Sequence, residues 1–241
     1  MRVAAVACGI AVFVASLVYG GPPGGVWQWA VLALGGVATA GLTVIAVLAD
    51  RRYRREHREF QVTVFDTLAP FVHALNLMAA ESATVRKRSL AGTLMAGLAA
   101  ATGLADADRA RATIFERRAR GDGEVLSPGP SMGQGDKPRS VFARGTPAGD
   151  EVWAAVDTDT TRFCRDVLRY PPAGWVSDGP RSYQTFITVP IRTGDCVHGI
   201  LTLNAPNSGD LTDEDVGVMQ VIASLLAAAY VLAAPVAARR T

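Results

Sequence analysis

Charged side chains are scarce in this sequence of 241 residues. Lys, Arg, Asp and Glu make up 19% of the chain, hydrophobic residues make up 49%, and the formal net charge is +2. A balance so close to neutral offers no basic face for a nucleic acid, which is therefore not expected as a partner. The hydrophobic share is high for a wholly soluble protein, and the excess lies at the N-terminal end.

Cysteine and histidine are also rare, with three of each. No two cysteines have the C-x-x-C spacing, which excludes a disulfide framework and leaves Cys164 and Cys196 as free thiols. Zinc requires about four ligands, whereas His57 and His73 precede the globular part, so no metal site is predicted. His198 alternates with Cys196 on one strand face, where a hydrogen-bonded sheet histidine is expected.

The usual catalytic patterns are missing as well. The segment "GQGDKP" lacks the Gly-Lys-Ser/Thr ending of a phosphate-binding loop, because Lys137 is followed by proline. No nucleophile and base stand at a recognisable spacing, and the adjacent carboxylates Asp213 to Asp215 fit a solvated helix N-terminus. The sequence predicts no catalytic residue, and we expect a protein that is not an enzyme.

Long uncharged runs are present at the N-terminus, over about 3–19 and 26–49. Each is long enough to cross a bilayer, and "GGPPGG" between them predicts a tight turn. Five arginines follow the second run, which by the positive-inside bias makes the rest of the chain cytoplasmic. We expect residues 1–50 to form a transmembrane hairpin of a multi-pass cell-membrane protein; a cleavable signal peptide with one anchor is the alternative.

Residues 51–88 are predicted to form a helical linker. Apolar residues recur from Val64 to Val85 at alternating spacings of three and four, as in the seam of a coiled coil. The seam predicts a homodimer with Leu68, Leu75 and Met78 at the contact. A globular helix shows nearly the same stripe, so amphipathic helices lying against their own domain are the alternative.

A globular region over 89–234, followed by a tail at 235–241, has an α+β pattern. Strands are predicted at "RARATIFERR", "GEVLS" and "RFCRDV", with a long loop over Ser127 to Pro147 and a short helix at "GDEVWAAVD". A final helix begins at the N-cap Thr212. Hairpin-linked strands with helices on one side indicate an antiparallel sheet with flanking helices.

The segment "TVPI", a turn at "TGD", "GILTL" and then "LTDEDVGVMQVIASLLAAAY" resemble the C-terminal half of GAF domains, which are cytosolic small-molecule sensors related to PAS domains. The resemblance covers about Leu90 to Leu232. The segments from Arg144 to Asp150 and from Pro171 to Trp175 are similar to "RG-P-GD" and "PPPGW" in short actinobacterial membrane proteins with one such domain.

The resemblance implies a non-catalytic, membrane-anchored sensory module in signal transduction. The ligand and any cofactor stay unidentified, because the cyclic-nucleotide signature lacks its Lys and Phe, and Cys164 lacks the following His of bilin-binding relatives. The residues that could line a ligand pocket are Phe163, Cys164, Trp175, Arg181, Tyr183, Phe186 and His198. A ligand-free dimerisation scaffold is the second interpretation, and an enzyme on the same fold is the third.

The chain ends soon after its last helix, so we expect the signal to pass through self-association or a separate output protein. The segment "TFITVPIRTGDCVHGILTLNAP" is predicted to form two strands joined by a turn. Pro190 in the first of them is expected at an irregularity of the sheet, where a missing backbone donor is tolerated. Gly199 is expected where a helix or a ligand approaches the backbone, so Gly199→Val should destabilise the domain more than Pro190→Ala.

Overall fold

The computed structural model describes residues 64–105, 109–121, 123–133, 138–174 and 182–235. The chain divides into two compact units, Met1–Val62 and Thr63–Thr241, and the described residues all belong to the second. The predicted transmembrane hairpin, the arginine cluster after it and most of the tail lie outside the described residues.

In this part of the chain, six strands form one antiparallel sheet in the order β3-β2-β1-β6-β5-β4. The long strands are β1 (Arg111–Arg120), β2 (Gly123–Gly133), β5 (Thr185–Thr193) and β6 (Cys196–Ala205). The short strands β3 (Phe142–Ala143) and β4 (Arg162–Cys164) close its two edges. The predicted loop after Ser127 is therefore wrong in part, because β2 continues to Gly133 and β3 follows.

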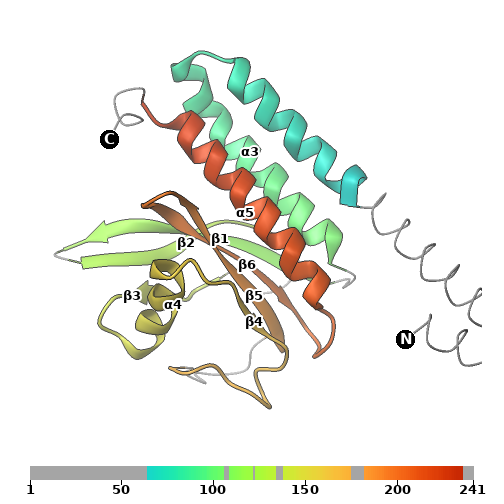
Figure 1. The fold of residues 1–241 in the computed structure, drawn as a ribbon, viewed down its shortest axis with the longest axis vertical. Coiled ribbons are helices and arrows are strands. Elements are labelled where there is room, and N and C mark those ends of the chain that lie inside the picture. The colour runs from blue at the N-terminus through green and yellow to red at the C-terminus, as the bar shows by residue number, and fades with distance from the viewer. Residues whose placement is uncertain (1–63, 106–108, 122, 134–137, 175–181, 236–241) are drawn as a thin grey trace, which may run out of the picture. The chain divides into compact units, whose positions relative to one another are not determined.

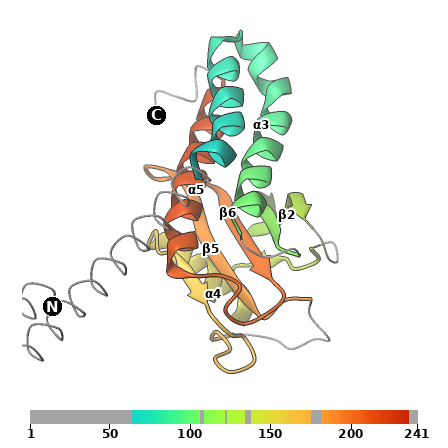
Figure 2. The ribbon, with the colours of Figure 1, turned by 90° about the vertical axis from the view of Figure 1, so that its right-hand side faces the viewer.

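Three helices cover one face of the sheet: Val64–Ala80, α3 (Ala83–Leu104) and α5 (Asp213–Ala233). They lie side by side above the strands in both ribbon views (Figures 1 and 2). The opposite face carries α4 (Pro147–Asp157). The expectation of an α+β fold with an antiparallel sheet is confirmed, although helices lie on both faces.

The helices meet at Gly97 of α3. A Cβ atom there would lie 2.8 Å from Cδ2 of Leu226 on α5 and 3.0 Å from Cζ of Phe71 on the first helix. Both side chains are fully buried. The missing side chain lets two neighbouring helices approach the backbone of α3, so that all three share one core above the sheet.

The middle of the stripe from Val64 to Val85 packs against its own domain, whereas Val85 is exposed. Phe71, Leu75 and Met78 are 0%, 8% and 1% exposed and belong to the core cluster that also includes the sheet. The stripe is also interrupted, because the first helix ends at Ala80 and α3 begins at Ala83. The alternative of amphipathic helices lying against their own domain is therefore correct for these residues. Leu75 and Met78 cannot form the predicted dimer contact.

Helix α5 starts as the sequence predicts. The backbone N–H and the hydroxyl of Thr212 both donate to the Asp215 carboxylate, at 2.7 and 2.9 Å. Among the described residues, α5 alone is long and apolar enough to cross a membrane. Its buried side chains, Met219, Ile222 and Leu226 among them, pack into the core of the domain, which accounts for its apolar composition.

The hairpin of β5 and β6 tolerates Pro190 because of its position. Strand β4 pairs with β5 only at Phe186, Ile187 and Thr188, so β5 has a partner on one side alone at Pro190. The register shift lies next to it, between Ile191 and Arg192, and leaves His198 of β6 as an extra residue. The predicted irregularity is thus displaced by one residue from the proline.

Gly199 lies where two strands approach closely. A Cβ atom there would overlap the carbonyl oxygen of Phe115 on the neighbouring strand β1. The close approach was predicted, but the group that approaches is a strand backbone instead of a helix or ligand. A backbone oxygen in a ladder cannot move aside as a side chain can.

We expect Gly199→Ala to destabilise the chain by about 1 to 3 kcal/mol, because the added methyl group overpacks against Phe115. Gly217 is the matched control. It lies on the exposed side of α5 with no atom within 4 Å of an added Cβ, so Gly217→Ala should stabilise by roughly 0.5 to 1 kcal/mol. Thermal unfolding midpoints of the purified full chain measure both; a shift of the same sign in the two variants contradicts this placement of β6.

Candidate functional site: a pocket between the sheet and helix α4

A pocket of about 1190 Å³ lies on the face of the sheet opposite α3 and α5. Its floor is formed by alternate residues of β1, β5 and β6. The intervening residues of the same strands, such as Ile114, Ile187 and Leu201, point into the helix-side core. The alternation of a strand therefore gives one face to the core and the other to the pocket.

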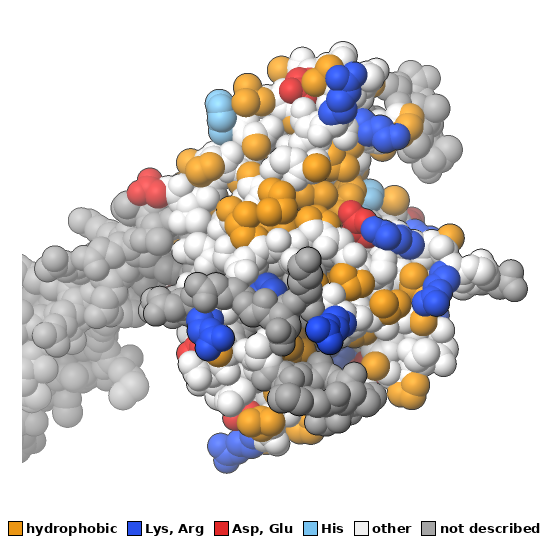
Figure 3. Space-filling model, turned by 180° about the vertical axis from the view of Figure 1, so that it is seen from behind, with side chains coloured by type: hydrophobic (Ala, Val, Ile, Leu, Met, Phe, Trp, Pro, Cys, Tyr) orange, Lys and Arg blue, Asp and Glu red, His pale blue; other side chains and the backbone are white. Residues whose placement is uncertain are grey.

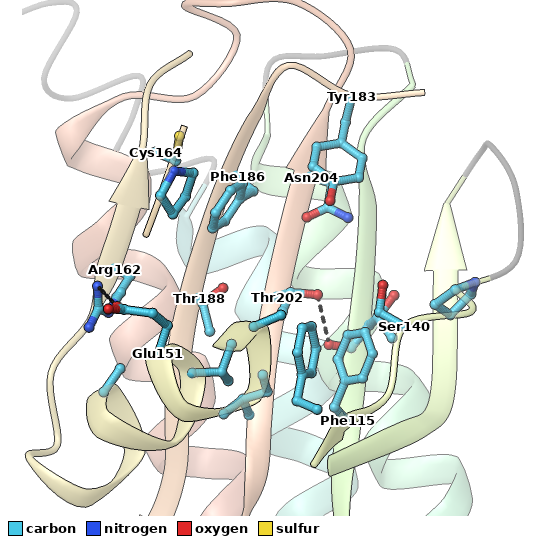
Figure 4. A pocket seen from close by; sticks show the side chains of 18 of the residues that line it. Phe115, Ser140, Glu151, Arg162, Cys164, Tyr183, Phe186, Thr188, Thr202 and Asn204 are labelled. Carbon is cyan, nitrogen blue, oxygen red and sulfur yellow. Dashed lines mark hydrogen bonds and ion pairs between the residues drawn. The ribbon is translucent and has the colours of Figure 1, made fainter. Parts of the chain in front are cut away.

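The strand register arranges the floor in two rows. One row contains Arg162, Thr188, Thr202 and Thr113, and the next contains Cys164, Phe186, Asn204 and Arg111. Figure 4 shows the first three members of each row on neighbouring strands. The Thr202 hydroxyl donates to the Thr113 carbonyl at 3.3 Å. Polar side chains thus occupy the centre of this sheet face.

Three segments form the walls: α4, residues 138–142, and the stretch that follows β4. Helix α4 contributes Ala148, Glu151, Val152 and Ala155. Aromatic rings line several sides, namely Phe115, Phe142, Tyr170, Tyr183 and Phe186. The combination of aromatic walls with a few polar groups on a fixed floor is typical of small-molecule sites.

The segment Arg144 to Asp150 fixes the start of α4. Thr146 caps the helix by accepting from the Gly149 N–H at 3.1 Å, and the Gly145 N–H donates to Asp150 Oδ1 at 2.7 Å. A Cβ atom at Gly149 would overlap the carbonyl oxygen of Ala143. The cap and the close backbone contact of "RGTPAGD" therefore fix the position of one wall of the pocket.

Arg144 adds an ionic support at the same corner. Its guanidinium makes two hydrogen bonds of 2.8 Å to the Asp157 carboxylate and lies 4.0 Å from the Trp153 ring centre. The hydrogen bonds from Arg144 lower the pKa of Asp157. The Trp153 indole N–H donates to the Phe142 carbonyl at 3.1 Å, which ties α4 to β3.

The described part of the second segment of the family resemblance, Pro171 to Gly174, contacts the same helix. At Gly174, with a positive φ of 70°, an added Cβ would overlap the Pro147 carbonyl oxygen at the first turn of α4. Pro172, Ala173 and Gly174 line the pocket. Gly174 thus allows this wall to lie directly against α4, which a larger residue would prevent.

The charges that line the pocket are mostly positive: Arg111, Arg139, Arg162 and Arg165 against Glu151. Arg162 pairs with Glu151 at 3.0 Å, as Figure 4 shows. Arg165 pairs with Asp213 of α5 at 2.6 Å. Among the described residues no carboxylate pairs with Arg111.

Arg111 and Thr113 carry polar atoms without partners. Arg111 is 9% exposed and Thr113 is 1% exposed. The Nε and Nη1 atoms of Arg111 and the Oγ1 atom of Thr113 are buried and have no hydrogen-bond partner among the described residues. Buried polar atoms are nearly always hydrogen-bonded, so two such residues side by side on one strand face need an explanation.

Cys164 lies on the floor beside Phe186 and is 8% exposed. Burial raises the pKa of its thiol, which donates weakly to the Tyr170 carbonyl at 3.5 Å. The thiolate is the reactive form, so this environment disfavours nucleophilic chemistry at neutral pH. Over the described ranges, no group of three or more His, Cys, Asp or Glu residues is placed to hold a metal ion.

The structure brings together four of the seven predicted pocket residues. Cys164, Tyr183 and Phe186 line the pocket. Phe163 borders it as well, but its ring packs against the helix-side core under the Arg165 guanidinium. The other two aromatic and basic candidates, Trp175 and Arg181, lie outside the described residues.

His198 is not among the described residues that line the pocket. Its ring stacks on Tyr230 of α5, with ring centroids 5.1 Å apart, so it faces the helix layer. Regular alternation would place it on the same face as Ile200 and Thr202. The bulge at His198 reverses its direction, and a bulge of this kind could not be located from the strand pattern alone.

Arg111, Thr113 and Thr202 were missed as pocket residues by the sequence reasoning. An arginine inside a strand that is otherwise "ATIF" is a detectable signal, because charged residues are almost never fully buried without a partner. The face of the sheet to which the Arg111 side chain points depends on the register of β1 with β6, however, and that pairing joins distant parts of the sequence.

The sequence model of one domain family matches residues 87–230, under the description GAF domain. The chain belongs to the GAF domain family. GAF domains are sensory and signalling modules, which gives this chain a regulatory role in outline. A comparison with curated proteins finds no match.

Solved structures, GAF domains among them, align with this chain. The GAF domain of a phosphoenolpyruvate-protein phosphotransferase from Acinetobacter aligns with 15% identity and a TM-score of 0.50, over 68% of this chain and 90% of that one. The GAF domain of a phosphoenolpyruvate-protein phosphotransferase from Coxiella burnetii aligns with 18% identity and a TM-score of 0.47, over 70% of this chain and 93% of that one. Free methionine-R-sulfoxide reductase from Neisseria meningitidis, solved with its substrate, aligns with 17% identity and a TM-score of 0.48, over 68% of this chain and 87% of that one.

We expect Cys164 of this GAF domain to react with iodoacetamide at least about tenfold more slowly than the exposed Cys196, because its thiol is buried and its pKa is raised. Peptide mass mapping of the alkylated full chain at pH 7.5 measures both rates. The variant Cys196→Ser should leave the alkylation rate of Cys164 unchanged. Equal rates at the two cysteines would show that the pocket floor is open to reagents and the thiol is activated.

Proposed function

We propose that this protein is a membrane-anchored cytoplasmic GAF-type sensory module that binds a small molecule. The observation that carries the proposal is the pocket of about 1190 Å³ between the sheet and α4, with hydroxyl, amide and guanidinium groups on its floor. Its size suits a small organic ligand or cofactor.

The pocket favours sensing over a ligand-free scaffold. A scaffold would fill this space with its own side chains, as the small cluster of Phe115, Leu126, Trp153, Val156 and Ile200 fills the neighbouring space under α4. Beside that cluster the cavity stays open and contains polar groups. This difference between two parts of one sheet face supports a site kept for a ligand.

The proposed module is non-catalytic. The pocket residues offer hydrogen bonds and aromatic surfaces, and the one thiol on the floor has a raised pKa. Such groups hold and orient a molecule, whereas covalent catalysis needs a nucleophile activated by a base or by a lowered pKa. The signal would then pass to a second copy or to a separate output protein.

Exposed apolar side chains on the helix layer support self-association. Phe65 and Leu77 on the first helix are 74% and 55% exposed, and Val221 on α5 is 49% exposed. These residues, instead of Leu75 and Met78, would form the contact of a homodimer.

Membrane anchoring rests on the uncharged runs at 3–19 and 26–49, and the cytoplasmic side on the arginines that follow. A nucleic acid is not part of the proposal. On the face shown in Figure 3, Lys and Arg side chains stand at separate places among white and orange atoms. A duplex would require a continuous basic surface.

The ligand proposal is tested with the pocket-blocking variant Thr202→Trp, whose indole would occupy the middle of the floor. Native mass spectrometry of the full chain, purified in a non-ionic detergent, should show a retained small molecule in the unmodified protein and much less of it in the variant. Thr84→Trp is the control, because Thr84 is exposed on the first turn of α3. Ligand binding is contradicted if the unmodified protein shows no added mass and no pool of metabolites raises its unfolding midpoint.

The topology proposal is tested with reporter fusions. A reporter joined after Thr241 should be active only as a cytoplasmic reporter, and one joined after Pro23 only as a periplasmic reporter, because the arginines follow the second run and the turn is uncharged. Periplasmic activity at Thr241 would reject the anchoring model.

A further inference from the structure

Arg111 carries a buried charge that the described part of the protein does not neutralise. Arg111 lines the pocket and is 9% exposed, and its Nε and Nη1 atoms have no hydrogen-bond partner in the part of the chain that the structure describes. Burying an ion without a partner costs folding free energy, because the charge loses its hydration and gains nothing in return. A domain that keeps such a residue has a use for it beyond packing.

The surroundings of Arg111 complete a receptor for an oxyanion. On the same strand face, Thr113 carries a buried hydroxyl without a partner. Across the ladder from Arg111 lies Asn204 of β6, which also lines the pocket. A guanidinium, a hydroxyl and an amide are all donors that carboxylates and phosphates accept.

Two of the other pocket arginines do not compete for this role, because Arg162 and Arg165 have their own carboxylate partners, Glu151 and Asp213. Arg139 also lines the pocket, but it is exposed, so its charge stays in contact with water. Glu151, on α4, is the carboxylate among the described lining residues, and Arg162 holds it. Positive charge is therefore in excess among the described residues that line the pocket, and such an excess attracts an anion into the cavity.

We infer that the ligand of this pocket is an organic anion, and that Arg111, with Thr113, binds its carboxylate or phosphate group. The inference rests on the proposed ligand-binding function and specifies the class of molecule. The aromatic walls, Phe115, Phe142 and Phe186 among them, receive the apolar part of that molecule. Carboxylate and phosphate share the chemistry that Arg111 recognises, so the experiment separates them.

Three probes of similar size test the charge requirement: benzoate, phenyl phosphate and the neutral benzamide. Their binding to the purified full chain is measured by isothermal titration calorimetry in dilute Tris chloride, free of carboxylate, phosphate and sulfonate buffers. We expect at least one anion to bind about tenfold more tightly than benzamide, because a hydrogen bond to a charged group is stronger than one to a neutral group. The tighter of the two anions identifies the oxyanion.

Arg111→Gln should abolish that preference, and Thr113→Val should weaken it several-fold. The matched control is Arg120→Gln, which removes the same charge from an exposed position at the other end of β1 and should keep the preference. Without any probe, the unfolding midpoint of Arg111→Gln should equal or exceed that of the unmodified chain, since a costly buried charge has been removed.

Equal binding of benzamide and the two anions, or an anion preference that survives Arg111→Gln, overturns the inference while the pocket remains a ligand site. Failure of all three probes to bind, together with a lowered midpoint in Arg111→Gln, also overturns it and assigns Arg111 to the framework. In that case, loss of the retained molecule in Thr202→Trp would still support the proposed function independently.

Discussion

The alternation of side chains along β1, β5 and β6 is the constraint on which the rest of the structure depends. Ile114, Ile187 and Leu201 bury their side chains under the helix layer, so their neighbours along each strand must face the other way. Those neighbours form the pocket floor. One sheet, a single strand layer thick, thus serves the apolar core and the polar site, and a one-residue slip in register would exchange the two.

The wall of the pocket formed by α4 depends on both apolar and polar interactions. Helix α4 is held on the sheet by Trp153 and Val156, which are buried in the small cluster with Phe115, Leu126 and Ile200. The Thr146 cap, the Arg144–Asp157 pair and the indole hydrogen bond to Phe142 fix the ends of the helix and its link to β3. The ion pair is partly exposed, and such contacts are individually weaker than core packing.

Much of the fold could be predicted from the sequence, because its local patterns are strong. The two apolar segments joined at "TGD" and the final helix with its Thr212 cap each correspond to an element of the structure. What failed depends on contacts between distant segments. The stripe from Val64 fits a dimer seam and a docked helix equally well, and only Phe71 against Gly97 decides between them. Likewise, the bulge at His198 and the register that points Arg111 into the pocket have no local signal.

The ladder between β1 and β6 also has a consequence for how the domain folds. Thr113 and Thr202, which its centre brings together, are 89 residues apart in the sequence. Contacts across such a separation form late and slowly, because the entropy of closing the intervening chain must be lost first. The pocket floor therefore depends on a contact that spans β2, α4 and β5 in the sequence, so a chain in which β1 and β6 have not paired lacks the floor. Occupancy of the pocket would then report that these two distant strands have met.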